Sequence, residues 1–236
     1  YRILIDCGMW QGDWDNYVKN WDSFLFDPQN IDAVILTHAH LDHCGRLPKL
    51  FAKGYNGPIY ATPATIDLAK IVLEDSYFIM DEKAFRKKLP KIFSQADMNK
   101  ALKSFVPLDY YEKQSLSPNI SFTPHNAGHI LGSSIVEIKA ANKTIVFSGD
   151  IGGNDMPLVK DIDLLHEADY VICEGTYGDR NHHDTKTRDE ELIKAVQRAT
   201  LNHSTLLITI FALERTQDIL EVLNNYYESH LDFAVP

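Results

Sequence analysis

The chain has 236 residues, of which 44% are apolar and 24% are charged, as is usual for a globular protein. Its 33 acidic and 23 basic side chains give a formal charge of −10, which argues against a broad basic face for binding nucleic acid. No apolar run reaches the length of a membrane span, and we expect no signal peptide and no membrane partner.

Short runs rich in β-branched residues alternate with longer helical patterns, and this predicts an α/β fold. The predicted strands cover residues 2–6, 33–37, 58–61, 120–123, 134–139, 144–148, 169–174 and 205–210. The predicted helices cover residues 46–53, 63–80, 94–104, 187–202 and 213–229. Thr62 followed by Pro63 is a typical helix start, and we expect Thr62 to have no other role.

The chain divides into two expected domains, residues 1–174 and residues 175–236. The first mixes strands with helices, whereas the second shows the strand–helix alternation of a parallel α/β unit. A polar, turn-rich segment, 175–184, joins them. Because the chain begins and ends inside apolar runs, we expect it to be part of a longer protein.

Three cysteines, Cys7, Cys44 and Cys173, are widely separated and never in C-x-x-C spacing. This argues against a disulfide framework and against a four-cysteine zinc site. We therefore expect each to be a small buried apolar side chain, and the protein to be cytoplasmic.

A cluster of metal-binding residue types follows the apolar strand predicted at 33–37. It consists of His38, His40, Asp42 and His43. Imidazole nitrogens and carboxylate oxygens are ligands that zinc accepts. In extended backbone, residues two apart point the same way, so His38 and His40 can converge on one ion. Asp42 and His43 follow as the chain turns into a helix, and they can face a second ion beside the first. Without a metal, these polar groups would lie against an apolar strand with no partner.

Four ligands on one short loop cannot complete two metal sites, so other strand ends must contribute. His129 and Asp150 each follow a glycine at a predicted strand edge, and glycine permits close backbone approach. Asp6 ends the first strand in the same way. The remaining histidines are expected in the core (His125, His166, His203 and His230) or in an exposed loop (His182 and His183).

Two further features have alternative interpretations. The basic run 85–91 is either a solvated helix end, which we favour, or an RNA contact. The three tryptophans Trp10, Trp14 and Trp21 either stack on bases or, as we favour, pack against the protein itself.

With His38-x-His40-x-Asp42-His43, His129, Asp150 and the upstream Asp6, the sequence resembles the metallo-β-lactamase-fold hydrolases. Four segments make it similar to the RNA-directed members of the β-CASP branch: 128–133, 147–152, 174–178 and 211–217. The resemblance implies an αββα sandwich without its N-terminal strands, followed by the start of an α/β β-CASP domain. Two further family histidines would lie beyond Pro236.

The resemblance also implies a metal-dependent phosphodiester hydrolase acting on RNA, an endo- or exoribonuclease. Two Zn²⁺ ions, with Mn²⁺ or Fe²⁺ as alternatives, would share a hydroxide that attacks the phosphate. One ion would be held by His38, His40 and His129, and the other by Asp42 and His43, with Asp150 bridging them. Since one ligand of the second ion lies beyond the chain, we expect residues 1–236 alone to cleave poorly.

The other implied site residues lie around these ligands. Asp6 would orient a ligand histidine or the hydroxide, and Glu174 matches the acidic residue of the first β-CASP motif. Asp6, Asp42, Asp150 and Glu174 are thus the expected catalytic acidic groups. Arg215 either contacts substrate phosphate or lies on a helix surface. RNA is the expected substrate, and a homo-oligomer would form through C-terminal parts outside this chain.

Two alternative functions fit the same ligands. One is a hydrolase of this fold acting on small esters, thioesters or lactams. The other is a non-catalytic subunit of an RNA-processing complex. The segments from Glu174 onward disfavour the first alternative, and the retained ligands disfavour the second.

Overall fold

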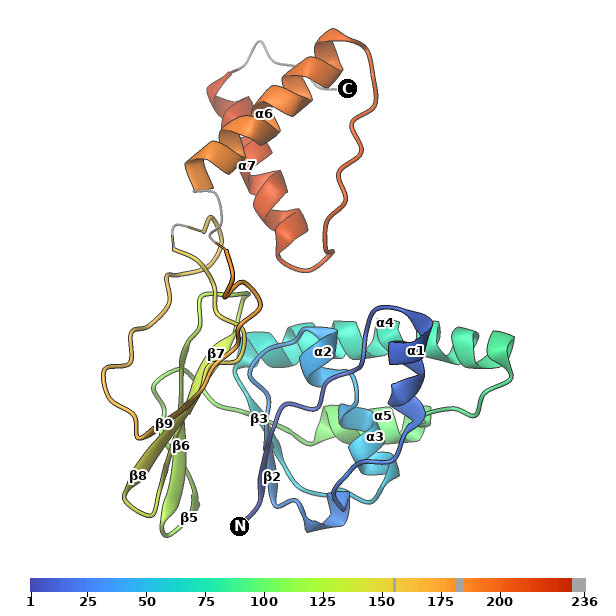
Figure 1. The fold of residues 1–236 in the computed structure, drawn as a ribbon, viewed down its shortest axis with the longest axis vertical. Coiled ribbons are helices and arrows are strands. Elements are labelled where there is room, and N and C mark those ends of the chain that lie inside the picture. Colours follow the sequence, from blue (N-terminus) through green and yellow to red (C-terminus); the bar gives the residue numbers. More distant parts are fainter. Residues whose placement is uncertain (155, 181–184, 231–236) are drawn as a thin grey trace.

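A computed structural model describes residues 1–154, 156–180 and 185–230. Figure 1 shows two sheets side by side, a layer of helices covering the first sheet, and a pair of helices set apart towards the C-terminus. The predicted α/β class is confirmed.

The first sheet is parallel, in the order β1 (Ile3–Ile5), β2 (Ala33–Ile35), β3 (Ile59–Ala61) and β4 (Phe105–Pro107). Parallel neighbours need crossover connections, and helices provide most of them. These helices are α1 (Trp14–Tyr17), α2 (Leu41–Cys44), α3 (Leu47–Ala52), α4 (Pro63–Lys87) and α5 (Gln95–Lys103). Two short 3₁₀ helices, Val18–Trp21 and Pro28–Asn30, lie between β1 and β2.

The second sheet is mixed. Strands β5 (Gln114–Ser117), β6 (Ile120–Asn126), β7 (Ser134–Ala140) and β8 (Lys143–Phe147) are antiparallel, and β9 (Tyr170–Ile172) is parallel to β8. One face of this sheet packs on the first sheet. A second, smaller cluster of buried side chains, Ala127, Ile135 and Val146, is covered by Ile162 and Leu165.

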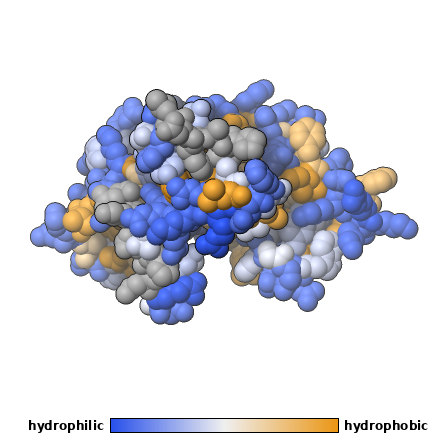
Figure 2. All heavy atoms as spheres, turned by 90° about the horizontal axis from the view of Figure 1, so that it is seen from above, coloured by the Kyte–Doolittle hydropathy of each residue, from blue (hydrophilic) through white to orange (hydrophobic). Residues whose placement is uncertain are grey.

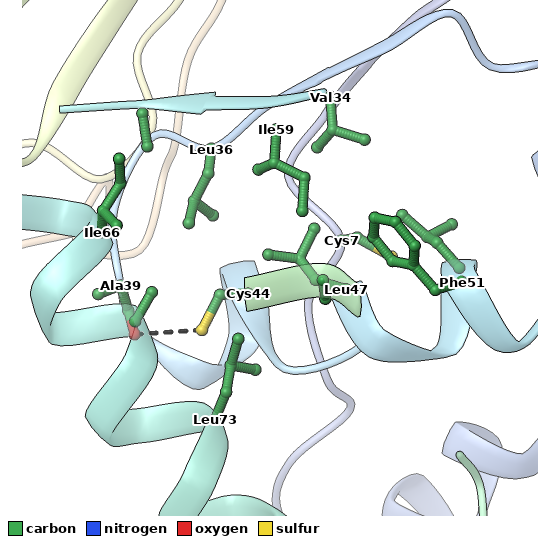
Figure 3. Close-up of a cluster of buried hydrophobic side chains, with 14 of the residues drawn as sticks. Cys7, Val34, Leu36, Ala39, Cys44, Leu47, Phe51, Ile59, Ile66 and Leu73 are labelled. Carbon is green, nitrogen blue, oxygen red and sulfur yellow. Dashed lines mark hydrogen bonds between the residues drawn. The ribbon is translucent and has the colours of Figure 1, made fainter. Parts of the chain in front are cut away.

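Strand β2 is buried on both faces, which explains its uniformly apolar sequence. Val34 and Leu36 point towards the helices, where they pack with residues such as Leu47 and Leu73 (Figure 3). Ile35, on the opposite face, packs with Phe122 of the second sheet. The end of β2 is therefore held between two layers, and the polar loop that follows it starts from a fixed position.

The C-terminal part consists of α6 (Thr185–Leu201) and α7 (Arg215–Ser229), joined by an irregular segment. The strand predicted at 205–210 is wrong. A strand needs a neighbour for its backbone groups, and no strand in the described part of the chain pairs with this segment. Its apolar side chains Leu207 and Ile210 are exposed.

Helix α4 continues seven residues past its predicted end at 80, because nothing in residues 81–87 interrupts a helix. It ends at Lys88, which has left-handed backbone, shortly before Pro90. The short elements α1, α2, β4 and β5 were not predicted because they carry too few residues for a periodic pattern.

Two of the three cysteine predictions are confirmed. Cys7 and Cys44 are buried, and the Cys44 thiol donates to the carbonyl of Ala39 at 3.3 Å (Figure 3). Cys173 is exposed, so that prediction is wrong; it follows β9, whose residues are themselves exposed. In the described ranges, every helix is too short or too polar to cross a membrane.

The predicted burial of four histidines is largely wrong. Only His125 is partly buried, beside Glu137 at 3.3 Å. The others are exposed because they lie in loops or beyond helix ends: His166, His203 and His230. The remaining pair, His182 and His183, lies outside the described residues.

Candidate metal centre

The structure brings together side chains from three separate segments. His38 and His40 follow β2, His129 lies in the loop between β6 and β7, and Asp150 follows β8. One donor atom from each of these four residues lies within 4.8 Å of every other. Among the described residues, they form the one group of at least three metal-ligand side chains this close.

The distances in this group match a tetrahedral metal site. The Nδ1 atom of His40 lies 3.1 Å from Nε2 of His38 and 3.0 Å from Nε2 of His129. The Oδ2 atom of Asp150 lies 3.7 Å and 3.6 Å from the same two Nε2 atoms. Zinc–nitrogen bonds of 2.0–2.1 Å imply ligand separations of about 3.3 Å in a tetrahedron. The donors therefore fit one such cation.

The other two ligand candidates lie on the far side of Asp150. The Nε2 atom of His43 is 3.2 Å from Oδ1 of Asp150 and 3.9 Å from Oδ2 of Asp42. The Asp42 side chain is 53% exposed. Asp150 thus presents one oxygen to the three-histidine side and the other to His43, which is the arrangement of a bridging carboxylate.

The protonation states of the three histidines suit metal binding. Burial lowers the pKa of His38 well below its usual value and lowers the pKa of His40 as well. Burial, with the nearby His40, lowers the pKa of His129 to about 4. At neutral pH these imidazoles are therefore uncharged and have lone pairs for a cation.

Asp150 and His43 form a charged pair. Burial opposes ionisation of Asp150, but the hydrogen bond from His43 and the charge interactions with His38, His43 and His129 together outweigh it and lower the pKa to about 2. Burial likewise opposes protonation of His43, yet hydrogen bonds to Asp150 and Asp6 raise its pKa to about 10. In the metal-free protein a protonated His43 thus balances the Asp150 carboxylate, and a cation would replace that proton.

Asp6 connects the two sides of the site. Its Oδ1 accepts from the backbone N–H of Thr37, and its Oδ2 accepts from the Thr37 hydroxyl, both at 2.8 Å. Nδ1 of His43 donates to the same Oδ2 at 2.7 Å. Because the Thr37 hydroxyl gives its proton to Asp6, it accepts from Nδ1 of His38 at 3.0 Å. Both histidines are thereby oriented, with Nε2 facing the site.

The loop that carries His129 is held by side chains from three directions. The Ser133 hydroxyl accepts from the N–H groups of His129 and Ile130, at 3.1 and 3.2 Å. The hydroxyls of Thr62 and Thr65 donate to the carbonyl of Gly132, at 2.7 and 2.8 Å. The expectation that Thr62 only begins a helix is therefore wrong, since its hydroxyl also fixes this loop.

The third support of the loop is Glu214, a residue not predicted from the sequence. Its Oε2 accepts from the N–H of Leu131 at 3.2 Å, and its side chain is 4% exposed. Its backbone has φ 68° and ψ −57°, and Arg215 N–H donates to the Leu213 carbonyl, which is a γ-turn. Such backbone is strained for a residue with a side chain.

We expect Glu214→Gly to weaken binding of a divalent cation such as zinc about tenfold, because the loop loses an acceptor that positions His129, a candidate ligand. The same variant should not lower the thermal unfolding temperature, because glycine relieves the strained backbone. Glu214→Gln keeps an acceptor oxygen and should bind zinc within about twofold of the original chain. Competition with a chromophoric chelator measures both affinities. Equal zinc affinity in the two variants would contradict this role.

Gly8 and Gly149 allow close backbone packing at the centre. A Cβ at Gly8 would lie 1.4 Å from the carbonyl oxygen of Asp42, so any side chain there displaces the backbone of that ligand segment. Gly149 has φ +55°, and a Cβ would lie 2.9 Å from Cβ of Thr37. Glycine before Asp150 therefore lets the β8 end approach the β2 end.

Gly8→Ala is expected to destabilise the fold by about 1–3 kcal/mol or more, since backbone must move to admit the methyl group. Zinc binding should weaken in parallel because Asp42 and His43 move. The matched control is Gly153→Ala, where a Cβ meets no atom within 4 Å. Denaturant unfolding of both variants measures the difference. If Gly8→Ala and Gly153→Ala are equally stable, the backbone of Asp42 does not lie as close to Gly8 as described.

Glu174 and Arg215 lie around the ligands rather than among them. Oε1 of Glu174 accepts from Ile151 N–H at 2.7 Å, directly after Asp150, and so fixes that turn. Nη1 of Arg215 lies 3.4 Å from Oδ2 of Asp218. Arg215 follows Glu214, whose side chain holds the His129 loop, and the charge of Arg215 contributes in a small part to the lowered pKa values of His40 and His129.

The comparisons with known proteins agree with this geometry. Residues 1–170 match the metallo-beta-lactamase superfamily domain. The chain is 43% identical over 222 residues to "Ribonuclease TTHA0252" of Thermus thermophilus, covering 94% of the chain and 49% of that protein. It is 35% identical over 232 residues to an "RNase J-like protein" of Methanocaldococcus jannaschii, covering 97% of the chain and 50% of that protein.

A third relative carries a different name. "Transcription termination factor FttA" of Methanocaldococcus jannaschii is 34% identical over 231 residues, which are 96% of the chain and 36% of that protein. The chain thus spans about half, or less, of the length of these curated relatives.

Proposed function

The chain belongs to the metallo-β-lactamase superfamily, and on that premise we propose that it is a metal-dependent hydrolase that cleaves the phosphodiester backbone of RNA. The observation that supports this most is the group of His38, His40, His129 and Asp150, whose donor separations suit one tetrahedral cation. The names of the relatives, two of them ribonucleases, favour RNA over a small ester, thioester or lactam.

The proposed centre holds two zinc ions, with manganese or iron as alternatives. His38, His40 and His129 would hold one ion, Asp42 and His43 would hold the other, and Asp150 would contact both. When bound, two such cations neutralise phosphate charge and lower the pKa of a water molecule towards neutrality. The same centre would reverse the local field in a chain whose formal charge is −10.

The chain's own residues supply orientation and charge. Asp6 and Thr37 keep the Nδ1 atoms of His43 and His38 occupied, so that only their Nε2 atoms face the site. Glu174 keeps the turn after Asp150 in place. Arg215 is half-exposed and follows Glu214, which holds the His129 loop, and its guanidinium would contact a phosphate oxygen of the substrate. Glu174 and Asp6 are thus proposed as positioning residues.

The finer family assignment is also part of the proposal. We place the protein in the β-CASP branch, with residues 1–174 as the metallo-β-lactamase domain and residues 175–236 as part of a β-CASP domain. The missing ligand of the second cation would then come from a segment outside this chain, and so would a homo-oligomer contact. A cytoplasmic location fits an RNA substrate.

Incubation of the full-length protein with end-labelled single-stranded RNA tests the proposal. Cleavage is expected with added zinc, none is expected with a chelator, and zinc should restore it. Residues 1–236 alone should cleave far more slowly. Cleavage that continues in chelator would contradict metal dependence. Hydrolysis of a thioester or lactam, with no RNA cleavage, would show that the protein is a small-molecule hydrolase.

A further inference from the structure

The strongest concentration of positive charge in the chain lies at the end of α4. Residues 83–91 contain five basic side chains and no acidic one, in a chain with a formal charge of −10. Two of the five are paired: Arg86 with Glu82, and Lys91 with Asp81 at 2.7 Å. The ammonium groups of Lys83, Lys87 and Lys88 have no carboxylate within 4.0 Å in the described part of the molecule.

Aromatic side chains from a distant segment lie directly beneath these lysines. The Nζ atom of Lys83 is 4.3 Å from the ring centre of Tyr17, and that of Lys87 is 5.2 Å from the ring of Trp14. The rings of Trp14 and Tyr17 stack with centres 5.9 Å apart. Figure 1 shows α1 beside the second half of α4. The fold thus combines a basic run with an aromatic segment 70 residues earlier in the chain.

Two tryptophan rings of the segment before and within α1 remain accessible. Trp10 is 47% exposed and Trp14 is 42% exposed. In Figure 2, the right-hand end of the molecule, where α4 ends, is mostly hydrophilic with apolar side chains among the charged ones. We call this surface the lysine–tryptophan face and define it by Trp10, Trp14, Lys83, Lys87 and Lys88.

The lysine–tryptophan face begins next to the candidate metal centre. Met9, which precedes Trp10, donates its backbone N–H to the carbonyl of Leu41 at 2.9 Å. Leu41 lies between His40 and Asp42, two of the candidate ligands. The segment that carries Trp10 is therefore held by its backbone against the segment that carries these candidate ligands.

We propose that the lysine–tryptophan face binds single-stranded RNA that extends from the metal centre, an inference that rests on the proposed function. Unpaired lysines match backbone phosphates, and accessible indole rings match unstacked bases. An acidic protein segment would use the lysines but gain little from the rings. Duplex RNA would use the phosphates but keep its bases stacked and out of reach.

A triple variant tests the contribution of charge. Lys83→Ser, Lys87→Ser and Lys88→Ser together should weaken binding of a fluorescein-labelled 20-residue poly(U) at least tenfold. Each phosphate contact in a single strand contributes about 0.7 to the slope of log affinity against log salt, so the slope should fall by about 2. The full-length protein is used in chelator, so that binding is measured without cleavage.

The matched control removes the same charge elsewhere. Lys113→Ser, Lys139→Ser and Lys143→Ser alter three lysines at one end of the second sheet and should leave affinity and salt slope unchanged. Equal weakening by both triple variants would overturn the proposal, because overall charge would then explain the binding.

Trp14→Ala tests the aromatic contribution. It should weaken poly(U) binding about tenfold, because stacking on one ring carries that much of the affinity, whereas Trp14→Tyr should restore most of it. Unchanged affinity in Trp14→Ala, or equal affinity for duplex RNA, would overturn the assignment to single strands. Binding is measured separately from cleavage. If the protein binds RNA through this face but does not cleave it, the proposed function is refuted and the RNA-binding proposal stands.

Discussion

Asp150→Asn is expected to reduce RNA cleavage by about a thousandfold or more and to lower the zinc content of the protein. Asp150 is the one candidate ligand that reaches both sides of the centre, 3.6–3.7 Å from His129 and His38 and 3.2 Å from His43. Asparagine keeps the size of the side chain but removes the negative charge. Without a well-bound cation, the pKa of the attacking water returns towards the much higher value of bulk water.

The measurement is kcat/KM on end-labelled RNA in saturating zinc, together with zinc per chain by elemental analysis. Asp67→Asn is the matched control, because that carboxylate is largely exposed on α4 and its one ion pair among the described residues is with Lys70. It should leave both quantities unchanged. Retention of more than a tenth of the activity by Asp150→Asn would refute the bridging role.

The second large effect is expected at Asp6, which does not touch the proposed cations. Asp6→Asn should weaken zinc binding about 10–100-fold, the usual cost of losing a carboxylate that orients a ligand histidine. The residue has φ 59°, which asparagine adopts readily, so the backbone should stay as it is. The Asp6 carboxylate accepts three hydrogen bonds through two oxygens, from the Thr37 N–H, the Thr37 hydroxyl and His43 Nδ1. Asparagine has one acceptor oxygen, and its NH2 group must face a donor at the other position, so at least one of these hydrogen bonds is lost.

Thr37→Val distinguishes the contribution of the hydrogen bond to His38 from that of the hydrogen bond to His43. Valine has the shape of threonine but no hydroxyl, so it breaks the connection to His38 and leaves the one from Asp6 to His43. Zinc affinity should fall about tenfold, less than in Asp6→Asn. Titration of both variants with zinc, followed by competition with a chromophoric chelator, gives the two constants. Unchanged affinity in Asp6→Asn would show that its hydrogen bonds do not orient ligands.

Much of the centre could be predicted from the sequence because its ligands follow apolar strands. The run before His38 is buried on both faces, and polar groups placed directly after such a strand must meet at the sheet edge. The glycines before His129 and Asp150 also indicate places where backbone segments approach each other closely. The structure places these three segments together, which spacing in the sequence could only suggest.

Residues that act through long-range contacts could not be predicted. Thr37 lies next to a ligand, but its role depends on Asp6, 31 residues earlier. Glu214 supports the His129 loop from 83 residues away, and no local pattern marks it. The predicted strand at 205–210 failed for the related reason that strands depend on neighbours, and none lies beside this segment among the described residues.

The lysine–tryptophan face illustrates the same limit. In the sequence, the basic run 85–91 and the tryptophans are separate features, and each alone is best explained as an ordinary surface. The continuation of α4 to Lys87 places Lys83 over Tyr17 and Lys87 over Trp14. The basic run and the aromatic segment thus form one surface that offers both positive charge and aromatic rings.

The most direct measurement is an anomalous-scattering map at the zinc absorption edge from crystals of the zinc-loaded protein. A peak is expected about 2.0–2.2 Å from Nε2 of His38, Nδ1 of His40, Nε2 of His129 and an oxygen of Asp150. A second peak should lie between Asp150, His43 and Asp42. A map with no peak among these side chains, in a protein that nonetheless cleaves RNA, would contradict the assignment of the centre.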